Sequence, residues 1–294
     1  MNKRPNEPLS RHCWNQLGGP AQLLIDVEND EELRSVLTEA STSQTTVRIL
    51  GLGSNLLVAQ EGVSGVVIRL TGEFATYSFD GETLTAGAGV DLRKVVSESV
   101  RQGRDGFWQL AGFPATIGGA IAMNAGGRWG EIGDILTTCE GYQLNGTPWQ
   151  QTAADCGFSY RHSEVPGVIT KATFTLKAGE PKLLRSKLKE VMSEKAAAQP
   201  LGAKTPSSGC SFRNPTIQGV RHSAGQLIDQ AGGKGLSVGG AMVSPTHANF
   251  IVTTPTATAS DVAALMGQVQ KIVAQHHSVL LEPEVIQWPE PRKN

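Results

Sequence analysis

Residues 117–126 read Ile117-Gly-Gly-Ala-Ile-Ala-Met-Asn-Ala-Gly126, and this stretch decides the fold class. The run is uncharged and rich in small residues, and glycines interrupt it too often for a helix or a membrane span. A backbone this bare is useful where a flat or anionic group must reach main-chain N–H groups without intervening side chains. We therefore expect a loop here that lies under a planar cofactor. The alternative is a buried crossing of two closely packed backbones.

Another glycine loop, Gly51-Leu-Gly-Ser-Asn55, lies earlier in the chain and follows a short apolar run. We call residues 51–55 the first glycine loop and residues 117–126 the second glycine run. A dinucleotide fingerprint would need a third glycine where Leu56 stands, and residues 56–58 continue as an apolar strand instead of opening a helix. The remaining interpretation is a tight loop whose amides, with the Ser54 and Asn55 side chains, wrap a pyrophosphate. An ordinary turn is the alternative for this loop alone, but the two loops together favour a cofactor.

Composition excludes several classes of protein. The chain has 294 residues, enough for two domains, and 26 basic against 27 acidic residues, which gives no electrostatic reason to expect nucleic acid. No apolar run follows the polar start or is long enough to cross a bilayer, so we expect no signal peptide, no membrane insertion and a cytoplasmic location. The cysteines lack CxxC spacing, which predicts reduced thiols and no metal.

Hydrophobic periodicity predicts an α+β fold. Asn29 or Asp30 caps a helix with apolar residues at helical spacing, Asp91 precedes a second, and Ser260 caps a last one. Further helices are expected over 183–198 and from Ala224. Strands are expected at 23–27, 47–50, 66–70, 84–88, 135–144, 168–176 and 247–253. Residues 201–208 contain glycine, proline and paired serines and predict a linker before a smaller C-terminal lobe.

Three polar segments lie downstream of the glycine loops. Phe158-Ser-Tyr-Arg-His-Ser163 carries Arg161, which is either a solvated surface arginine or a fork that binds a carboxylate. The segment 206–215 carries Cys210 between a glycine and a hydroxyl, and it is otherwise a loop with a free thiol. In Leu281-Glu-Pro-Glu-Val285, apolar residues after Glu284 suggest a carboxylate that points inward, against the alternative of a charged strand end.

Six motifs occur in one order: GLGSNLLV, LAGFPATIGGAIAMNAGG, SYRHS, SSGCSFRNP, HANFIV and LEPEV. Together they resemble the UDP-N-acetylenolpyruvoylglucosamine reductase family, also called UDP-N-acetylmuramate dehydrogenase, over residues 15–288. The resemblance implies a PCMH-type FAD-binding domain of the vanillyl-alcohol oxidase kind over 15–180, with subdomains 15–70 and 71–180. It further implies a bridging helix at 181–199 and a substrate-binding lobe at 200–294. A monomer of the shorter form of the family is expected.

The resemblance also implies a reaction in peptidoglycan synthesis. NADPH reduces a non-covalently bound FAD, and hydride then passes to UDP-N-acetylglucosamine enolpyruvate, which gives UDP-N-acetylmuramate. Arg161 and Glu284 would polarise the substrate carboxylate, and Cys210 would donate the proton. The family uses serine or cysteine at the donor position, and counting from Gly209 selects Cys210, although Ser211 is adjacent.

The family positions that map to cofactor and substrate follow. The cofactor-binding residues are Gly51, Gly53, Ser54, Asn55, Leu56, Gly112, Pro114, Ala115, Thr116, Gly118, Gly119, Ala120, Asn124 and Gly126; the substrate-binding residues are Tyr160, Gln199, Asn214, His247 and Asn249. Ala115 replaces a family glycine, which requires a negative φ there, and Lys195 stands where an arginine is expected. Two alternatives are a related flavoprotein acting on another small alcohol or hydroxy acid, and a nucleotide-sugar-binding protein that has lost catalysis.

Overall fold

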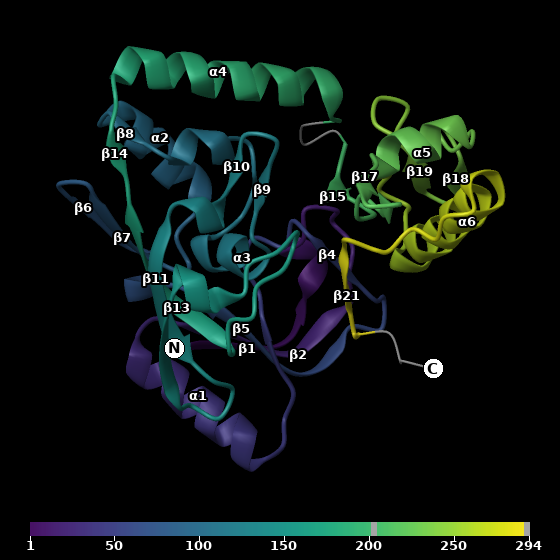
Figure 1. Ribbon diagram of the computed structural model, residues 1–294. Helices are drawn as coiled ribbons and strands as arrows, with labels where there is room; N and C mark the ends of the chain where they lie inside the picture. The colour runs from purple at the N-terminus through teal and green to yellow at the C-terminus, as the bar shows by residue number, and fades with distance from the viewer. Residues whose placement is uncertain (201–204, 291–294) are drawn as a thin grey trace. The chain divides into compact units, whose positions relative to one another are not determined.

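The computed structural model describes residues 1–200 and 205–290 and divides into two compact units (Figure 1). The first unit comprises residues 1–5, 22–52 and 64–194. The second comprises residues 6–21, 53–63 and 195–294. The continuous boundaries expected from the sequence miss the two early segments of the second unit. The division also falls inside the first glycine loop, between Leu52 and Gly53.

One sheet of the first unit has the strand order β1-β2-β5-β3. Its strands are β1 (Asn2–Pro8), β2 (Pro20–Val27), β5 (Val63–Leu70) and β3 (Val47–Ile49), with β3 parallel to β5. The helix α1 (Asp30–Thr42) buries the apolar residues that the periodicity selected. Asn29 caps it, because its side-chain oxygen accepts a hydrogen bond from Glu32 N at 3.0 Å. This helix was predicted correctly.

The larger sheet of the first unit is antiparallel, in the order β12-β11-β13-β7-β6. Its strands are β12 (Pro148–Thr152), β11 (Leu136–Tyr142), β13 (Val168–Thr175), β7 (Thr83–Gly87) and β6 (Tyr77–Asp80). The helix α2 (Leu92–Arg101) follows Asp91, as predicted, and Asp91 caps it. The core holds Phe107 and Phe174, whose rings meet edge to face at 5.0 Å. The remaining elements are α3 (Ile117–Ala122), α4 (Pro181–Ala198), and the strand pairs β8 (Arg104–Asp105) with β14 (Lys177–Ala178) and β9 (Gly126–Gly127) with β10 (Gly130–Glu131).

The prediction that the run after Thr116 is not helical is wrong, because Ile117–Ala122 forms the short helix α3. The Thr116 hydroxyl accepts a hydrogen bond from Gly119 N at 3.1 Å and caps it. Gly118 lies so close to the larger sheet that a Cβ there would be 2.8 Å from Ala88 Cβ. Close tertiary packing and a cap therefore offset the low helix propensity of glycine.

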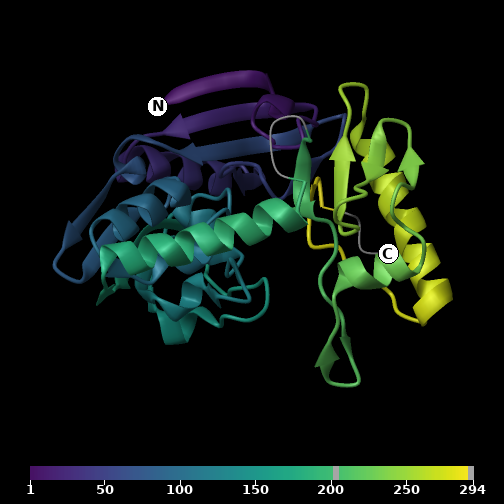
Figure 2. The ribbon, with the colours of Figure 1, turned by 90° about the horizontal axis from the view of Figure 1, so that it is seen from above.

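The second unit contains an antiparallel sheet in the order β15-β20-β19-β18. Its strands are β15 (Ser207–Cys210), β20 (Phe250–Thr253), β19 (Ala241–Val243) and β18 (Ser237–Val238). The helix α6 (Ala259–His277) lies against this sheet, as its yellow ribbon shows in Figure 2. Thr258 caps α6 through a capping box with Asp261, so the predicted cap at Ser260 is wrong by two residues. Also present are α5 (Ala224–Gln230) and the hairpin of β16 (Thr216–Ile217) and β17 (Val220–Arg221).

A parallel strand pair within the second unit joins distant parts of the sequence. The strand β4 (Leu56–Val58) pairs with β21 (Ile286–Trp288), with Leu56 opposite Ile286. The apolar run after the first glycine loop is thus a buried strand, as predicted. The predicted linker gives a different result: residues 201–204 lie outside the described residues, and Ser207 already belongs to a strand. Within the described ranges, no helix combines the length and apolar character needed to cross a bilayer.

Candidate functional site

The first glycine loop presents a row of main-chain donors. None of the N–H groups from Gly51 to Asn55 donates a hydrogen bond to another residue in the described part of the chain. The loop is held by other atoms, since the carbonyl of Gly53 accepts from Trp14 N at 3.1 Å. Successive main-chain N–H groups without protein acceptors can donate to an anion. Donors of this kind are what the predicted role of residues 51–55 in binding a pyrophosphate requires, and that role stays a prediction.

The second glycine run has the opposite character, because its first four N–H groups donate within the protein. The bonds run from Ile117 N to Val90 O at 2.9 Å, Gly118 N to Ala88 O at 2.9 Å, Gly119 N to Thr116 Oγ1 at 3.1 Å and Ala120 N to Thr116 O at 2.8 Å. The expectation that these amides are free to meet a cofactor is therefore wrong. What the run offers instead is a surface without side chains. A Cβ on Gly119 would meet only the Thr116 hydroxyl, at 3.3 Å.

The two loops approach each other within the first unit. A Cβ on Gly51 would lie 2.9 Å from Thr116 Oγ1, so the absence of a side chain at Gly51 makes room for that hydroxyl. Gly112 has φ +78°, whereas Ala115 is not among the residues of positive φ, as its Cβ requires. Residues from both loops therefore border one small-residue surface in this unit.

Contacts within the protein explain two residues that were assigned to the cofactor, Asn124 and Gly126. The Asn124 side chain is 2 % exposed and bonds two other segments, with its amide donating to Ser159 O at 3.2 Å and its oxygen accepting from Gly133 N at 3.2 Å. A Cβ on Gly126 would lie 2.5 Å from Glu131 Cα, so close strand pairing explains that glycine. Contact of either with a cofactor stays a prediction.

Arg161 lies in a tight turn of the first unit. Ser159 and His162 exchange both main-chain hydrogen bonds at 3.1 Å, which leaves Tyr160 and Arg161 as the two central residues. Arg161 has φ +57°, in the region where glycine is favoured. Its guanidinium carbon lies 5.0 Å from the centre of the Tyr160 ring, a cation–π contact that orients the fork.

Cys210 follows a β-bulge in the second unit. Ser207 lies opposite Val252 and Cys210 opposite Phe250, so β15 has one more residue than its partner between these pairs. Gly209 lies within the bulge and has φ +77°, a backbone conformation that glycine adopts without strain. Bulges of this kind turn the following side chain to a new direction, and here that side chain is the Cys210 thiol.

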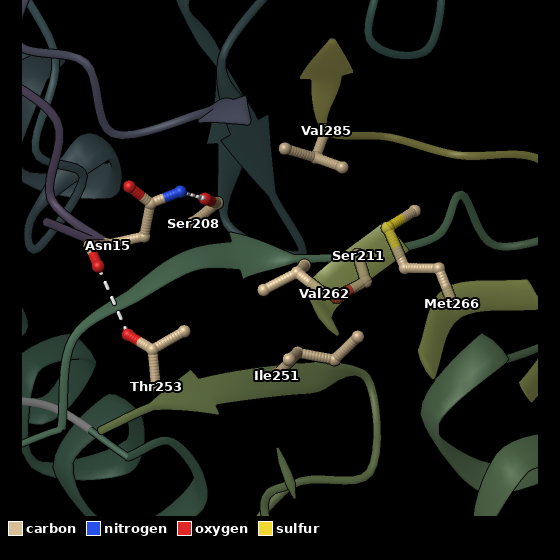
Figure 3. Close-up of a pocket in the computed structure, with 8 residues that line it drawn as sticks. All are labelled: Asn15, Ser208, Ser211, Ile251, Thr253, Val262, Met266 and Val285. Atoms are coloured by element: carbon tan, nitrogen blue, oxygen red, sulfur yellow. Dashed lines mark hydrogen bonds between the residues drawn. The ribbon is translucent and has the colours of Figure 1, made fainter. Parts of the chain in front are cut away.

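The next residue, Ser211, faces the interior of the second unit. It is 6 % exposed and lines a small cavity of about 10 Å³ beside Met266 and Val285 (Figure 3). Cys210, in contrast, is half-buried. Because neighbouring side chains of an extended chain point to opposite faces, Cys210 faces away from the cavity that Ser211 lines.

Glu284 lies on the segment that pairs with the residues after Cys210. Its N–H donates to Ser211 O at 2.9 Å, and Phe212 forms a bridge with Pro283. On the other side, Asn55 Nδ2 donates to the carbonyl of Glu284 at 3.2 Å. Cys210 and Glu284 therefore come from adjacent segments of one unit, and Glu284 is also fixed by the first glycine loop.

Comparison with known proteins shows which family this chain belongs to. A model described as UDP-N-acetylenolpyruvoylglucosamine reductase, C-terminal domain, matches residues 199–288, and an FAD-binding domain model matches residues 21–147. The reductase 2 of Symbiobacterium thermophilum is 37 % identical over 97 % of this chain and 92 % of its own length. The chain belongs to the UDP-N-acetylenolpyruvoylglucosamine reductase family. It is an FAD-dependent oxidoreductase with an α+β fold and a PCMH-type FAD-binding domain.

Other members of the reductase family also match this chain over most of its length. The enzyme of that name from Methylorubrum populi is 38 % identical over 95 % of this chain and 89 % of its own. The crystal structure of the reductase from Thermus caldophilus superposes with a TM-score of 0.85 at 39 % identity and covers 98 % of both chains. The six motifs that suggested the reductase family therefore stand in a chain that matches it from end to end.

The residues predicted to bind substrate, by resemblance to the reductase family, differ in the contacts that they make within the protein. The Asn249 side chain is buried and clamps Phe212, accepting from its N–H at 2.9 Å and donating to its carbonyl at 2.8 Å. The oxygen of Asn214 accepts from Ala224 N at 2.9 Å, at the start of α5. Gln199 closes α4, its N–H donating to Lys195 O at 2.9 Å. Asn249 is thus held by the segment that follows Cys210.

The ring of His247 contacts both Asn249 and Phe250. Burial lowers the pKa of its ring below the ordinary value. The N–H of Asn249 donates to His247 Nδ1 at 3.2 Å, so the neutral ring carries its proton on Nε2. The ring also meets Phe250 edge to face at 4.9 Å. Among the residues that the structure describes, the Nε2–H group of this ring has no hydrogen-bond acceptor.

Buried Asn15 and partly buried Ser208, to which the sequence analysis assigned no role, brace this region. Asn15 Nδ2 donates to Ser208 Oγ at 2.9 Å (Figure 3). It also donates to Leu56 O at 2.8 Å, and Ser208 Oγ donates to the same carbonyl at 2.8 Å. They tie the strand after the first glycine loop to the strand that carries Cys210. Partners so far apart in sequence leave no local signal by which they could have been found.

Proposed function

We propose that this chain reduces UDP-N-acetylglucosamine enolpyruvate to UDP-N-acetylmuramate, a step of peptidoglycan precursor synthesis, with NADPH as the electron source. The observation that carries the proposal is the main-chain hydrogen bond from Glu284 N to Ser211 O at 2.9 Å, since it joins the segment of Glu284 to the residue that follows Cys210. Membership of the reductase family and the donor row in the first glycine loop support it. A binding protein that had lost catalysis would have no need of both groups.

The first glycine loop would hold the cofactor's diphosphate through the N–H groups of residues 51–55. FAD, when bound, supplies the hydride for the β-carbon of the enolpyruvyl group. The bare surface formed by Gly51 and Gly119 around the Thr116 hydroxyl would leave room for a flat ring.

Arg161 and Glu284 would act on the substrate carboxylate. An enol ether accepts hydride poorly, so negative charge moving into its carboxylate must be stabilised as it develops. The guanidinium of Arg161 offers a fixed cation with paired donors, and Glu284 would hydrogen-bond the same group as a protonated acid or through water. Removing one preorganised donor of this kind slows a step by about 10²–10³-fold.

Cys210 would deliver a proton to the α-carbon. A thiol with a reference pKa near 8.5 is mostly protonated at neutral pH and is a far stronger acid than a serine hydroxyl. The burial of Ser211 in the opposite direction favours Cys210 as the donor. The thiolate left behind would take a proton from solvent before the next cycle.

Separate anaerobic half-reactions test these assignments. We expect the purified protein to be yellow and to bleach with NADPH in the wild type and in Cys210→Ala alike. Adding UDP-N-acetylglucosamine enolpyruvate should restore the colour quickly in the wild type and about 10²–10⁴-fold more slowly in Cys210→Ala, which lacks the general acid. Cys210→Ser should keep a substantial part of the rate, and Ser211→Ala is the matched control that should keep nearly all of it.

Each result has a distinct meaning. Normal turnover in Cys210→Ala with loss in Ser211→Ala would move the proton donor to Ser211. Protein that stays colourless after reconstitution with FAD would favour the binding-only alternative. Bleaching that the enolpyruvate does not reverse would point to another substrate.

A further inference from the structure

The turn that presents Arg161 is supported from both ends by side chains close to the second glycine run. Before the turn, the Ser159 carbonyl accepts from Asn124 Nδ2 at 3.2 Å. After it, Ser163 Oγ donates to the carbonyl of Ala122, the last residue of α3, at 3.0 Å. Ser163 had no role in the sequence analysis, and Asn124 was assigned to the cofactor.

Asn124 is itself fixed. Its amide also donates to Glu131 Oε2, and its oxygen accepts from Gly133 N at 3.2 Å. The side chain is 2 % exposed, and each of its polar atoms has a protein partner. A buried amide satisfied in this way is rigid, because any rotation would break several hydrogen bonds at once.

The turn needs such support because its backbone is strained. A main-chain bond joins His162 N to Ser159 O, and Arg161 has φ +57° at the third position of the turn. Glycine is the residue that accepts this conformation without penalty, so an arginine there persists only when its surroundings hold it. Arg161 is therefore both the residue with the strained backbone and the residue proposed to bind the substrate carboxylate.

We infer that Ser163 and Asn124 are positioning residues for the Arg161 guanidinium, and that they tie its turn to the end of α3. The inference rests on the proposed function, since it takes Arg161 as the group that binds the carboxylate. Neither positioning residue touches the substrate in this scheme. Their effect reaches it only through the direction of the arginine.

A double-mutant cycle on product binding tests the inference at equilibrium. The affinity of the oxidised holoenzyme for UDP-N-acetylmuramate is measured by calorimetry for the wild type, Ser163→Ala, Arg161→Ala and the double variant. We expect Arg161→Ala to weaken binding about 10- to 100-fold, as loss of a charged hydrogen-bond donor does. Ser163→Ala should weaken it roughly threefold to tenfold in the wild type and less than about twofold in Arg161→Ala, because its action passes through the arginine.

Ser163→Thr is the conservative comparison, because it keeps the hydroxyl and should keep wild-type affinity. Melting temperatures of all variants exclude general unfolding as the cause of any loss. Equal effects of Ser163→Ala with and without Arg161, or no effect at all, would overturn the positioning role. Unchanged product affinity in Arg161→Ala would instead overturn the proposed role of Arg161, so the two failures are distinguishable.

Discussion

At the scale of single residues, Arg161 combines a charged side chain with a backbone conformation that non-glycine residues rarely adopt. Its motif identified it as a candidate fork for a carboxylate, but no sequence pattern predicted φ +57°. Strain of this kind is retained where the direction of a side chain matters more than local stability. The Tyr160 ring at 5.0 Å restricts the guanidinium further, so position and orientation are fixed together.

Replacing Arg161 by glycine and by alanine should separate backbone strain from side-chain function. Both variants lose the guanidinium and should lose product affinity to a similar extent. Glycine adopts φ +57° without strain, so Arg161→Gly should be more stable than Arg161→Ala by about 1–2 kcal/mol. Urea unfolding of the two apoproteins measures the difference, and an alanine variant of equal or greater stability would show that the turn relaxes to another conformation.

At the scale of elements, α3 shows how packing and ligand binding can require neighbouring glycines for different reasons. Gly118 faces the larger sheet of the first unit, where a Cβ would lie 2.8 Å from Ala88 Cβ. Gly119 faces open space apart from the Thr116 hydroxyl at 3.3 Å. One glycine is therefore explained by the fold, and the other is free to serve a ligand.

Alanine substitutions in α3 should give opposite results at the two positions. Gly118→Ala forces the helix away from the sheet and should lower stability by about 1–3 kcal/mol, despite the higher helix propensity of alanine. Gly119→Ala should leave the apoprotein as stable or slightly more stable, but weaken FAD binding by roughly tenfold or more. Urea unfolding of the apoproteins and quenching of flavin fluorescence provide the two measurements; unimpaired FAD binding in Gly119→Ala would remove that glycine from the cofactor surface.

The elements that the sequence predicted well are those specified by local interactions. The helices α1 and α2 follow from a cap and apolar spacing, both of which lie within a few neighbouring residues. The helix α3 was missed because its stability comes from packing against Ala88, a contact that glycine-rich composition hides. Likewise, the motifs pointed to Arg161, Cys210 and Glu284, whereas the hydrogen bonds that fix them join residues far apart in sequence.

At the scale of the whole molecule, buried thiols link stability to pH in both units. Burial raises the pKa of Cys13 in the second unit to about 12. In the first unit, burial and the neighbouring Cys156 raise the pKa of the Cys139 thiol, and the two sulfur atoms are 3.5 Å apart. Unfolding returns these groups to water, where they ionise near pH 9. The folded state therefore holds protons at alkaline pH that the unfolded state releases.

The sign of this linkage gives a prediction. Stability from the raised Cys13 pKa is fully present below about pH 9 and is lost as the pH rises toward 12. Each such thiol should lower the free energy of unfolding by about 1.4 kcal/mol per pH unit in that window. Cys13→Ala should flatten the slope above pH 9 by that amount, whatever its effect on packing. Urea unfolding between about pH 8 and 11 tests this, and Cys13→Ser should give the same slope as Cys13→Ala.

The parallel pairing of β4 with β21 has a consequence for biosynthesis. Leu56–Val58 leaves the ribosome long before Ile286–Trp288, since the whole intervening chain must be translated first. The apolar residues of β4, which are buried in the folded protein, therefore remain unpaired with β21 on the nascent polypeptide until translation is nearly finished. The first unit can begin to fold during translation, whereas the second can be completed only after β21 has emerged. Chaperones that shield early apolar segments should accordingly matter more for the yield of this protein than for one whose lobes are contiguous in sequence.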